Sequence, residues 1–455
     1  LNSPPPYRSP ITDYQLRALF LNCHTAFSFK YGTMPVLTLF NEARRCGVHK
    51  LVMTEINNVA SYIEMLRLCK ENAPLPGSTM TAYGQEGYAL DIALGIEFRK
   101  EHELLYILLA RNNEGFEKIN RFLSHHNLTA KPFPPQAPEI DNAFVIYPFG
   151  KVTPEILRDN EFIGVQLQHL STFALYSPFK TFPHKFLILH PVTFAHKIDF
   201  NTHRLLRAID KNTLLSKLPP HEQAHPGEIM MTEKELAHRF RHYPELIENT
   251  RCILDACTIN FSLGQDKNKK HVTGSEEGDW DYLVTKSWEG FQGRYDVSKP
   301  ELRERIQREL RIIREKGFIA YYLIAYDLIR FAREKGFDYV GRGSGANSVV
   351  AFCLGITNVD PIELDLYFER FLNSERTSPP DFDIDFSWDN RDAVYDYFFD
   401  TYGRDHVCLL ATHVTYQKRS VLRELGKVFG LPKEEIDLIV EEPLAHKDRD
   451  QITEL

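Results

Sequence analysis

The feature that most constrains the fold of this 455-residue chain is the stretch P-P-D-F-D-I-D-F at residues 379–386. Aspartates at positions 381, 383 and 385 alternate with Phe382, Ile384 and Phe386. Because side chains on a β-strand point alternately to its two faces, the pattern predicts a strand with one acidic and one apolar face. The apolar face is expected to lie against a hydrophobic core.

The acidic face carries Asp381, Asp383 and Asp385 at steps of two residues. Carboxylates about 7 Å apart repel one another, and each raises the pKa of its neighbour unless a cation is present. Mg²⁺ prefers oxygen ligands of this kind. The stretch therefore indicates a metal-dependent phosphoryl-transfer site. The alternative is an amphipathic edge strand with a solvated acidic face, and an isolated Asp-x-Asp pattern would favour that alternative.

The composition is that of an ordinary soluble globular protein, with 43% hydrophobic and 25% charged residues. A net charge of −8 gives no global electrostatic argument for binding nucleic acid, although it permits a local basic channel. The seven scattered cysteines include no C-x-x-C pair, which predicts reduced thiols in a cytoplasmic protein. No run of about 18 apolar residues exists, so no membrane partner is expected.

The first part of the chain, residues 15–209, alternates short apolar runs with helical periodicity. Strands are predicted at 19–21, 51–53, 89–95, 104–110, 143–147, 162–167 and 185–189, and helices at 36–46, 60–69, 114–125 and 202–209. This alternation predicts an α/β domain with parallel strands. Seven strands favour a barrel-like closure over an open sheet.

A polar segment at 263–280 marks the expected main domain boundary. Beyond it we predict helices at 301–316, 321–335, 391–402 and 416–429, and strands at 337–340 and 407–411.

The Gly-rich segment V-G-R-G-S-G-A-N-S at 340–348 leads from a predicted strand into a predicted helix. Gly343 lets the backbone approach a ligand, Ser344 offers a hydroxyl, and a helix starting near Ala346 would direct its first amides at the loop. No Gly-Lys-Ser/Thr follows, so the segment is not a Walker A loop. Taken alone, it is better interpreted as a tight structural turn.

Three motifs taken together carry a more specific signal: G-R-G-S at 341–344, F-E-R-F-L-N-S-E-R at 368–376 and P-D-F-D-I-D-F at 380–386. They resemble the palm of the C-family bacterial replicative DNA polymerases, the family of the DNA polymerase III alpha subunit. The resemblance is strong over residues 300–430 and looser over the N-terminal domain, which is similar to the family's polymerase-and-histidinol-phosphatase (PHP) domain.

The resemblance implies a three-part α/β organisation. A distorted (β/α)7 PHP barrel would occupy residues 1–265, and a mixed α/β palm of the beta-like nucleotidyltransferase type would occupy 266–412. Residues 413–455 would begin a helical thumb. The third catalytic aspartate of the family lies farther downstream than this chain extends. We therefore expect an N-terminal fragment with a partial palm that cannot polymerise DNA by itself.

Residue roles follow from the same resemblance. Asp381 and Asp383 match the two catalytic, metal-binding aspartates, and Asp385 matches the third acidic position, which supports the metal site. Gly343 and Ser344 match the element that holds the incoming triphosphate.

Basic residues are implied on both sides of the acidic strand. Arg370 and Arg376 match nucleotide-binding positions, where the planar guanidinium suits phosphate oxygens; the alternative for both is an ion pair with a neighbouring glutamate. Lys418 and Arg419 are candidates for contacts to the DNA backbone, and a solvated helix face explains them equally well.

The implied activity is that of a DNA-directed DNA polymerase for chromosomal replication. A primer 3′-hydroxyl would attack the α-phosphate of a dNTP at a site holding two Mg²⁺ ions. The expected partners of the full-length protein are primer–template DNA, a proofreading exonuclease subunit, the sliding clamp and other replisome subunits.

The PHP metal site is expected to be degenerate. Asn22 stands in place of the first histidine of the family's His-x-His pair, so that only His24 remains. The usual Thr-Asp-His element reads Thr-Glu55-Ile56, and Glu97 matches a retained acidic ligand. Too few ligands remain for a multinuclear centre, so no PHP metal is expected. Two other functions remain as alternatives to the polymerase assignment. The chain could be a PHP-type phosphoesterase or nuclease, or a non-catalytic scaffold that docks a proofreading exonuclease.

Overall fold

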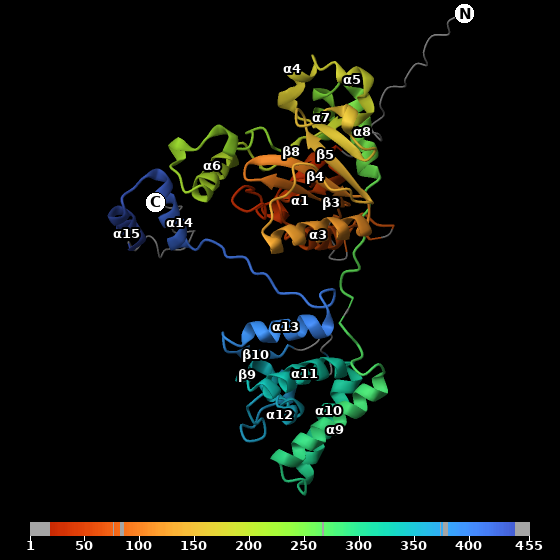
Figure 1. Ribbon diagram of the computed structural model, residues 1–455, viewed down its shortest axis with the longest axis vertical. Helices are drawn as coiled ribbons and strands as arrows, with labels where there is room; N and C mark the ends of the chain where they lie inside the picture. Colours follow the sequence, from red (N-terminus) through yellow and green to blue (C-terminus); the bar gives the residue numbers. More distant parts are fainter. Residues whose placement is uncertain are drawn as a thin grey trace, which may run out of the picture. The chain divides into compact units, whose positions relative to one another are not determined.

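The computed structural model describes residues 19–75, 77–81, 86–265, 268–373, 375 and 381–441. Two compact units make up the chain (Figure 1). The first contains residues 1–263 together with 415–455, and the second contains residues 264–414. The chain therefore leaves the first unit and later returns to it.

The first unit is built on an eight-stranded sheet with the order β7-β6-β5-β4-β3-β2-β1-β8. Its strands are β1 (Phe20–Cys23), β2 (Lys50–Met53), β3 (Asp91–Lys100), β4 (Glu103–Ala110), β5 (Ala143–Pro148), β6 (Glu161–Val165), β7 (Phe186–Ile188) and β8 (Pro191–Val192). The sheet curls as a partial barrel whose edges are β7 and β8 (Figure 1). This confirms the predicted α/β barrel-like architecture and adds β8, a strand too short to be recognised by its pattern.

The expectation of parallel strands is wrong at β4, which runs antiparallel to both β3 and β5. Only Glu101 and His102 separate β3 from β4, and Glu101 adopts a left-handed conformation with φ 55°. A parallel connection needs a crossover of a dozen or more residues, so this two-residue link requires a hairpin. The hairpin places His102 at an exposed turn.

Most strand residues are buried on both faces of the sheet. Along β3, Leu94 and Ile96 belong to one hydrophobic cluster, whereas Ala93 belongs to a second cluster on the opposite face. Burial on both faces explains why these strands read as nearly continuous apolar runs.

The first unit also contains ten α-helices among its described residues. They are α1 (Val36–Cys46), α2 (Tyr62–Asn72), α3 (Asn113–Thr129), α4 (Leu170–Phe173), α5 (Pro178–Thr181), α6 (Asp199–Asp210), α7 (Glu233–Arg239), α8 (Pro244–Asp255), α14 (Lys418–Phe429) and α15 (Lys433–Glu441). As predicted, α1 ends at Gly47, whose φ of 68° closes the helix with a left-handed cap.

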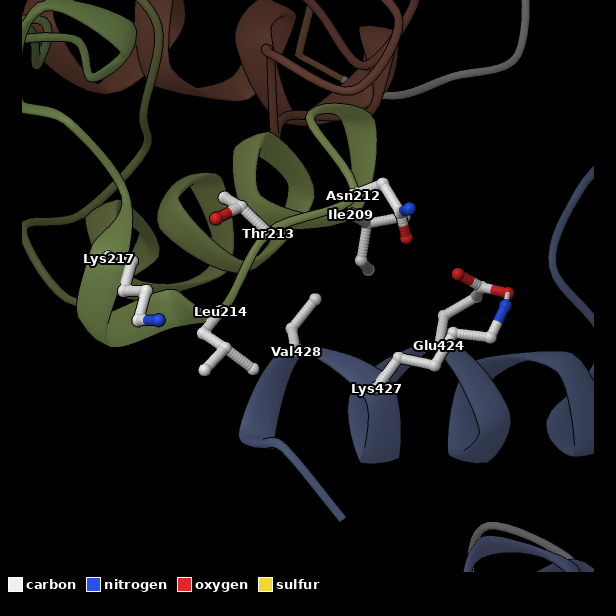
Figure 2. A pocket seen from close by; sticks show the side chains of 8 residues that line it. All are labelled: Ile209, Asn212, Thr213, Leu214, Lys217, Glu424, Lys427 and Val428. Atoms are coloured by element: carbon white, nitrogen blue, oxygen red, sulfur yellow. Dashed lines mark hydrogen bonds and ion pairs between the residues drawn. The ribbon is translucent and has the colours of Figure 1, made fainter. Parts of the chain in front are cut away.

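The late helix α14 packs against α6, which explains why residues after 414 join the first unit. A cavity of about 240 Å³ lies at this contact (Figure 2). Leu214 and Val428 form its apolar wall, and the Glu424–Lys427 ion pair, at 2.6 Å, lies at its rim.

The second unit contains five helices and one two-stranded sheet among its described residues. They are α9 (Glu276–Arg294), α10 (Pro300–Glu315), α11 (Ile319–Lys335), α12 (Val349–Leu354), α13 (Arg391–Tyr402), β9 (Tyr339–Arg342) and β10 (Asp383–Phe386). Helices α9 to α12 enclose a separate hydrophobic core, against which one face of the small sheet packs.

One helix of this unit has no counterpart among the predicted elements, and one predicted strand is wrong. The buried stripe of α9, spaced every four residues, contains Asp279 and Ser287 beside Leu283 and Phe291, so the apolar periodicity that would indicate a helix is broken. The strand predicted at 407–411 is irregular chain with exposed leucines, since no neighbouring strand among the described residues pairs with it.

Among the residues that the structure describes, no helix combines the length and the apolar character needed to cross a membrane.

Candidate active site

The acidic strand is one half of the antiparallel pair formed by β9 and β10, in which Asp383 lies opposite Arg342 and Asp385 opposite Val340. On the apolar face, Phe382 stacks on Tyr321 with ring centroids 5.2 Å apart, and Ile384 and Phe386 pack against the same core. The predicted division into an acidic and an apolar face is confirmed. Core packing on one face therefore fixes the carboxylates on the other.

Asp383 and Asp385 both interact with the side chain of Arg342, a residue to which no sequence pattern assigned a role. The Nε atom of Arg342 donates to Asp385 Oδ2 at 2.6 Å, and its guanidinium lies 3.4 Å from Asp383 Oδ2. Hydrogen bonding to Asp385 and the charges of both aspartates raise the pKa of Arg342. The guanidinium thus offsets the repulsion between the two carboxylates. Asp381 lies exposed just before the strand.

The Gly-Ser turn meets the acidic strand directly. Gly343 has a φ of 75°, and a Cβ atom built on it would lie 2.6 Å from Asp383 Oδ2. Glycine is the residue that tolerates both the left-handed conformation and this close approach. The carbonyl oxygen of Ser344 accepts a hydrogen bond from Asn347 Nδ2 at 2.8 Å. Two motifs distant in sequence therefore meet at Asp383.

The helix after this turn does not present free amides to it, so that expectation is wrong. Residues Gly343–Asn347 form a 3₁₀ helix, η7, and α12 begins only at Val349. The Ser348 hydroxyl accepts from the amide of Ala351, and Glu309 Oε2 accepts from the amide of Val350 at 3.2 Å.

Glu309 is fully buried and forms an ion pair with Arg305 at 2.7 Å. Burial raises the pKa of its carboxyl, and Arg305 opposes that effect. A buried carboxylate therefore satisfies the start of α12, where a ligand phosphate was expected.

Of the two predicted nucleotide-binding arginines, Arg370 lies within the described residues. Arg370 ends the 3₁₀ helix η8 (Phe368–Arg370) and is exposed. Its neighbour Glu369 pairs instead with Arg308 at 2.9 Å, so the alternative of a local Glu369–Arg370 ion pair is not observed. Arg376 lies outside the described residues.

Lys418 and Arg419, the candidates for the DNA backbone, are exposed at the start of α14. They belong to the first unit, whereas the acidic strand belongs to the second.

In the first unit, Asn22, His24 and Glu97 form one buried cluster. Asn22 Nδ2 donates to Glu97 Oε2 at 2.7 Å, and His24 Nε2 lies 3.1 Å from the same oxygen. The other ring nitrogen of His24 lies 3.1 Å from the Thr193 hydroxyl. Both nitrogens of the retained histidine are therefore hydrogen bonded.

The second oxygen of Glu97 is bound by Arg99, whose Nε donates to it. Burial by itself would raise the pKa of Glu97, but the charges of Arg99 and His24 outweigh it and lower that pKa to about 2. The Arg99 guanidinium also lies over the Tyr31 ring, 4.4 Å from its centroid. An organic cation thus neutralises the carboxylate that the resemblance identifies as a metal ligand.

Glu55 accepts hydrogen bonds from hydroxyl groups and is also buried. The hydroxyls of Thr25, Ser28 and Ser61 all donate to it, at 2.5 Å from Ser28 and 2.6 Å from Ser61. Ile56, at the position of a histidine ligand in the family, offers no donor atom. Glu55 therefore organises the loops around it.

Two later histidines, His190 and His203, are hydrogen bonded to the backbone. His203 accepts from the amide of Ala224 at 2.9 Å and its other nitrogen lies 2.7 Å from the Tyr31 carbonyl oxygen. Burial lowers the pKa of His203 to about 4. His190 lies 3.0 Å from the carbonyl oxygen of Ile229, and burial lowers its pKa as well. Hydrogen bonds to the backbone thus engage a ring nitrogen of each histidine.

The chain combines a curled α/β domain with a second unit in which a Gly-Ser turn meets an Asp-x-Asp strand. Residues 21–158 match the family model of the PHP domain, and residues 281–454 match that of the bacterial DNA polymerase III alpha NTPase domain. The chain is therefore similar, over two separate ranges, to a PHP domain and to a bacterial DNA polymerase III alpha NTPase domain.

Curated relatives agree with these matches. The DNA polymerase III subunit alpha of Escherichia coli K12 is 28% identical over 475 residues, covering 93% of this chain and 39% of the relative. An error-prone DNA polymerase of Symbiobacterium thermophilum is 28% identical and is matched over 95% of this chain and 43% of its own length. The Pasteurella multocida alpha subunit is 37% identical over 54% of this chain. The chain therefore spans about two fifths of the length of the full-chain relatives.

Proposed function

We propose that this chain provides the PHP domain and part of the palm of a DNA-directed DNA polymerase that acts in chromosomal replication. The observation that carries the proposal is the meeting of Gly343 with Asp383, where a Cβ atom added to the glycine would lie 2.6 Å from the carboxylate oxygen. A side-chain-free turn beside a carboxylate leaves room for a phosphate chain next to a metal ligand. The names of the relatives agree with this chemistry.

In the proposed site, Asp381 and Asp383 would hold two Mg²⁺ ions, and Asp385 would support them. Exposed carboxylate oxygens are the donors that Mg²⁺ prefers, so the residues fit the ion. When bound, the metal supplies electrostatic stabilisation of the phosphoryl group and of the attacking 3′-hydroxyl. Gly343 and Ser344 would position the triphosphate of the incoming dNTP.

Arginines would supply the remaining positive charge. Arg342 holds Asp383 and Asp385 in the structure described, and it would turn toward phosphate when a metal takes its place. Arg370 and Arg376 would bind phosphate oxygens, and the exposure of Arg370 leaves it available for this role. Lys418 and Arg419 would contact primer–template DNA.

We propose that the PHP domain of this chain is structural. Asn22 and His24 contact one oxygen of Glu97 and Arg99 contacts the other, so both oxygens already have partners within the protein. Under this proposal, the PHP domain is expected to have no phosphoesterase activity. Docking of a proofreading exonuclease, the sliding clamp or other replisome subunits would belong to the longer protein.

The proposed borders are 1–265 for the PHP domain, 266–412 for the palm and 413–455 for the start of the thumb. The changes of compact unit after Leu263 and after Val414 support the first two borders. The free state of all seven cysteines supports a cytoplasmic location.

Primer extension tests the proposal. The 455-residue chain alone is expected to incorporate no dNTP, and a longer protein that contains this sequence is expected to be active with Mg²⁺. In that protein, Asp381→Ala and Asp383→Ala should each abolish incorporation. The matched control is Asp389→Ala, which changes an exposed aspartate three residues after β10. Full activity of the Asp381→Ala/Asp383→Ala double variant would refute the assignment.

A further inference from the structure

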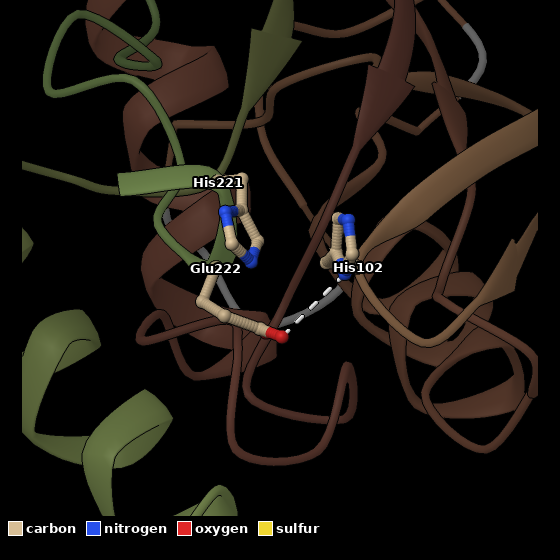
Figure 3. Close-up of side chains that lie close together, drawn as sticks. All are labelled: His102, His221 and Glu222. Carbon is tan, nitrogen blue, oxygen red and sulfur yellow. Dashed lines mark ion pairs between the residues drawn. The ribbon is translucent and has the colours of Figure 1, made fainter. Parts of the chain in front are cut away.

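A second group of metal-ligating side chains lies in the first unit, apart from the buried Glu97 cluster. His102, His221 and Glu222 each direct a donor atom toward the others, and these atoms all lie within 4.8 Å of one another (Figure 3). His102 Nδ1 is 3.5 Å from Glu222 Oε1, and the centroids of the two imidazole rings are 4.4 Å apart. Ligands about 2.0 to 2.1 Å from a tetrahedral Zn²⁺ are separated by roughly 3.4 Å. Small side-chain rotations would therefore complete three corners of a tetrahedron.

The backbone positions these three residues independently of any metal. His102 lies in the hairpin turn between β3 and β4, and His221 and Glu222 lie in the 3₁₀ helix η6 (Pro220–Glu222). The two histidines are exposed, whereas Glu222 is buried. Arg207 fixes Glu222 through a 2.6 Å ion pair to Oε2, so that Oε1 faces His102. One ligand is thus preorganised and two can adjust.

We propose that His102, His221 and Glu222 bind one transition-metal ion of the Zn²⁺ type. Two imidazoles and one carboxylate, with a fourth position open, form a donor set that Zn²⁺ accepts. Both histidines line a cavity of about 480 Å³ that also includes Arg99 and His225. In the proposed site, the open position would face this cavity and would hold water or a small anion.

One neighbouring cation competes with the metal. Lys211 Nζ lies 3.1 Å from Glu222 Oε1, the oxygen assigned to the metal, and its side chain is 29% exposed. Arg207, in contrast, binds the other oxygen and is itself paired with Asp210. The ion must displace Lys211 but not Arg207. Removing the lysine charge should therefore tighten metal binding, an effect that a purely structural cluster would not produce.

The test uses the full 455-residue chain, freed of metal with a chelator and titrated with Zn²⁺ against a chromophoric competitor. We expect one tight equivalent, and a tetrahedral visible spectrum when Co²⁺ replaces Zn²⁺. His102→Ala and His221→Ala should each weaken binding by more than about tenfold. Lys211→Met should strengthen binding by several fold.

Two controls separate this site from others. His196→Ala removes an exposed histidine of the same unit that lies outside the cluster, and should leave the affinity unchanged. His24→Ala should also leave it unchanged; if the tight equivalent disappears in His24→Ala and persists in His102→Ala, the metal is at the Glu97 cluster and the proposal fails. Absence of a tight equivalent, or equal affinity in wild type and both cluster variants, would overturn it as well.

Discussion

Replacing Arg99 with methionine tests whether the Arg99 guanidinium neutralises Glu97, the carboxylate that the resemblance identifies as a metal ligand of the PHP domain. Arg99→Met keeps most of the side-chain volume but leaves Glu97 buried without its cation. The pKa of Glu97 falls from its usual 4.5 to about 2 in the folded chain. At about 1.4 kcal/mol per pH unit, that difference corresponds to roughly 3 kcal/mol of stability at neutral pH. Breaking buried ion pairs costs about 3 to 5 kcal/mol, so the two figures agree.

The assay can observe the first unit separately. All three tryptophans, at 280, 288 and 388, belong to the second unit. Tryptophan fluorescence therefore follows unfolding of the second unit, and far-UV circular dichroism follows both units. Arg99→Met should lower the urea midpoint of a dichroism transition while leaving the fluorescence midpoint in place.

The pH dependence supplies a second readout. Because the folded pKa of Glu97 is lowered, the stabilisation is complete above pH 4.5 and is lost as pH falls toward 2. Arg99→Met should remove that dependence, and adding Glu97→Gln should recover much of the lost stability. If Arg99→Met changes the free energy of unfolding by less than about 1 kcal/mol, the buried pair is not what holds this cluster.

Four further predictions concern single residues. Gly343→Ala should destabilise the second unit by about 1 kcal/mol or more, measured by the fluorescence midpoint, because φ is 75° and the new Cβ approaches Asp383; an unchanged midpoint would contradict the described turn. Glu309→Ala should cost about 3 kcal/mol and Glu309→Gln less, because the amide oxygen can still accept from the start of α12; equal losses would argue against that cap. Arg342→Ala should raise the affinity for Mn²⁺, measured by electron paramagnetic resonance, and Asp383→Ala should abolish the binding. The Mn²⁺ affinity of Arg342→Lys should lie between those of Arg342→Ala and wild type; identical affinities would exclude competition by the guanidinium. Burial keeps the pKa of His203 near 4, so stability of the first unit should fall as pH drops from about 6.5 to 4, and His203→Gln should flatten this slope; an unaltered slope would assign it to another group.

The sequence patterns that predict the structure correctly are those in which each residue has a single dominant role. The alternation around Asp383 shows both faces of β10, since its apolar residues only pack and its acidic residues only face outward. The end of α1 at Gly47 was likewise predictable, because a left-handed cap favours glycine.

The patterns that failed involve polar residues inside the fold. Asp279 and Ser287 are buried in α9, where they interrupt the apolar periodicity and conceal the helix. Glu309, 41 positions before Val350, satisfies the start of α12, and no local pattern indicates such a contact. Arg342 became visible as the partner of the acidic strand only when the register of β9 and β10 was known.

The metal candidate escaped prediction from the sequence for a related reason. His102 and His221 are far apart in the chain and do not form a recognised ligand spacing. The β3–β4 hairpin and the 3₁₀ helix η6 bring them together. Only the tertiary fold makes the cluster apparent.

The return of the chain to the first unit gives the second unit an unusual topological status. Residues 264–414 are fastened at both ends, the far end through the packing of α14 on α6. The second unit therefore closes a loop of chain, and closing that loop carries an entropic cost that an appended domain would not have. A single proteolytic cut within 403–417 would release this constraint while α14 stayed bound by packing alone. The persistence of the two pieces as one complex would then measure directly how strongly the α6–α14 contact holds.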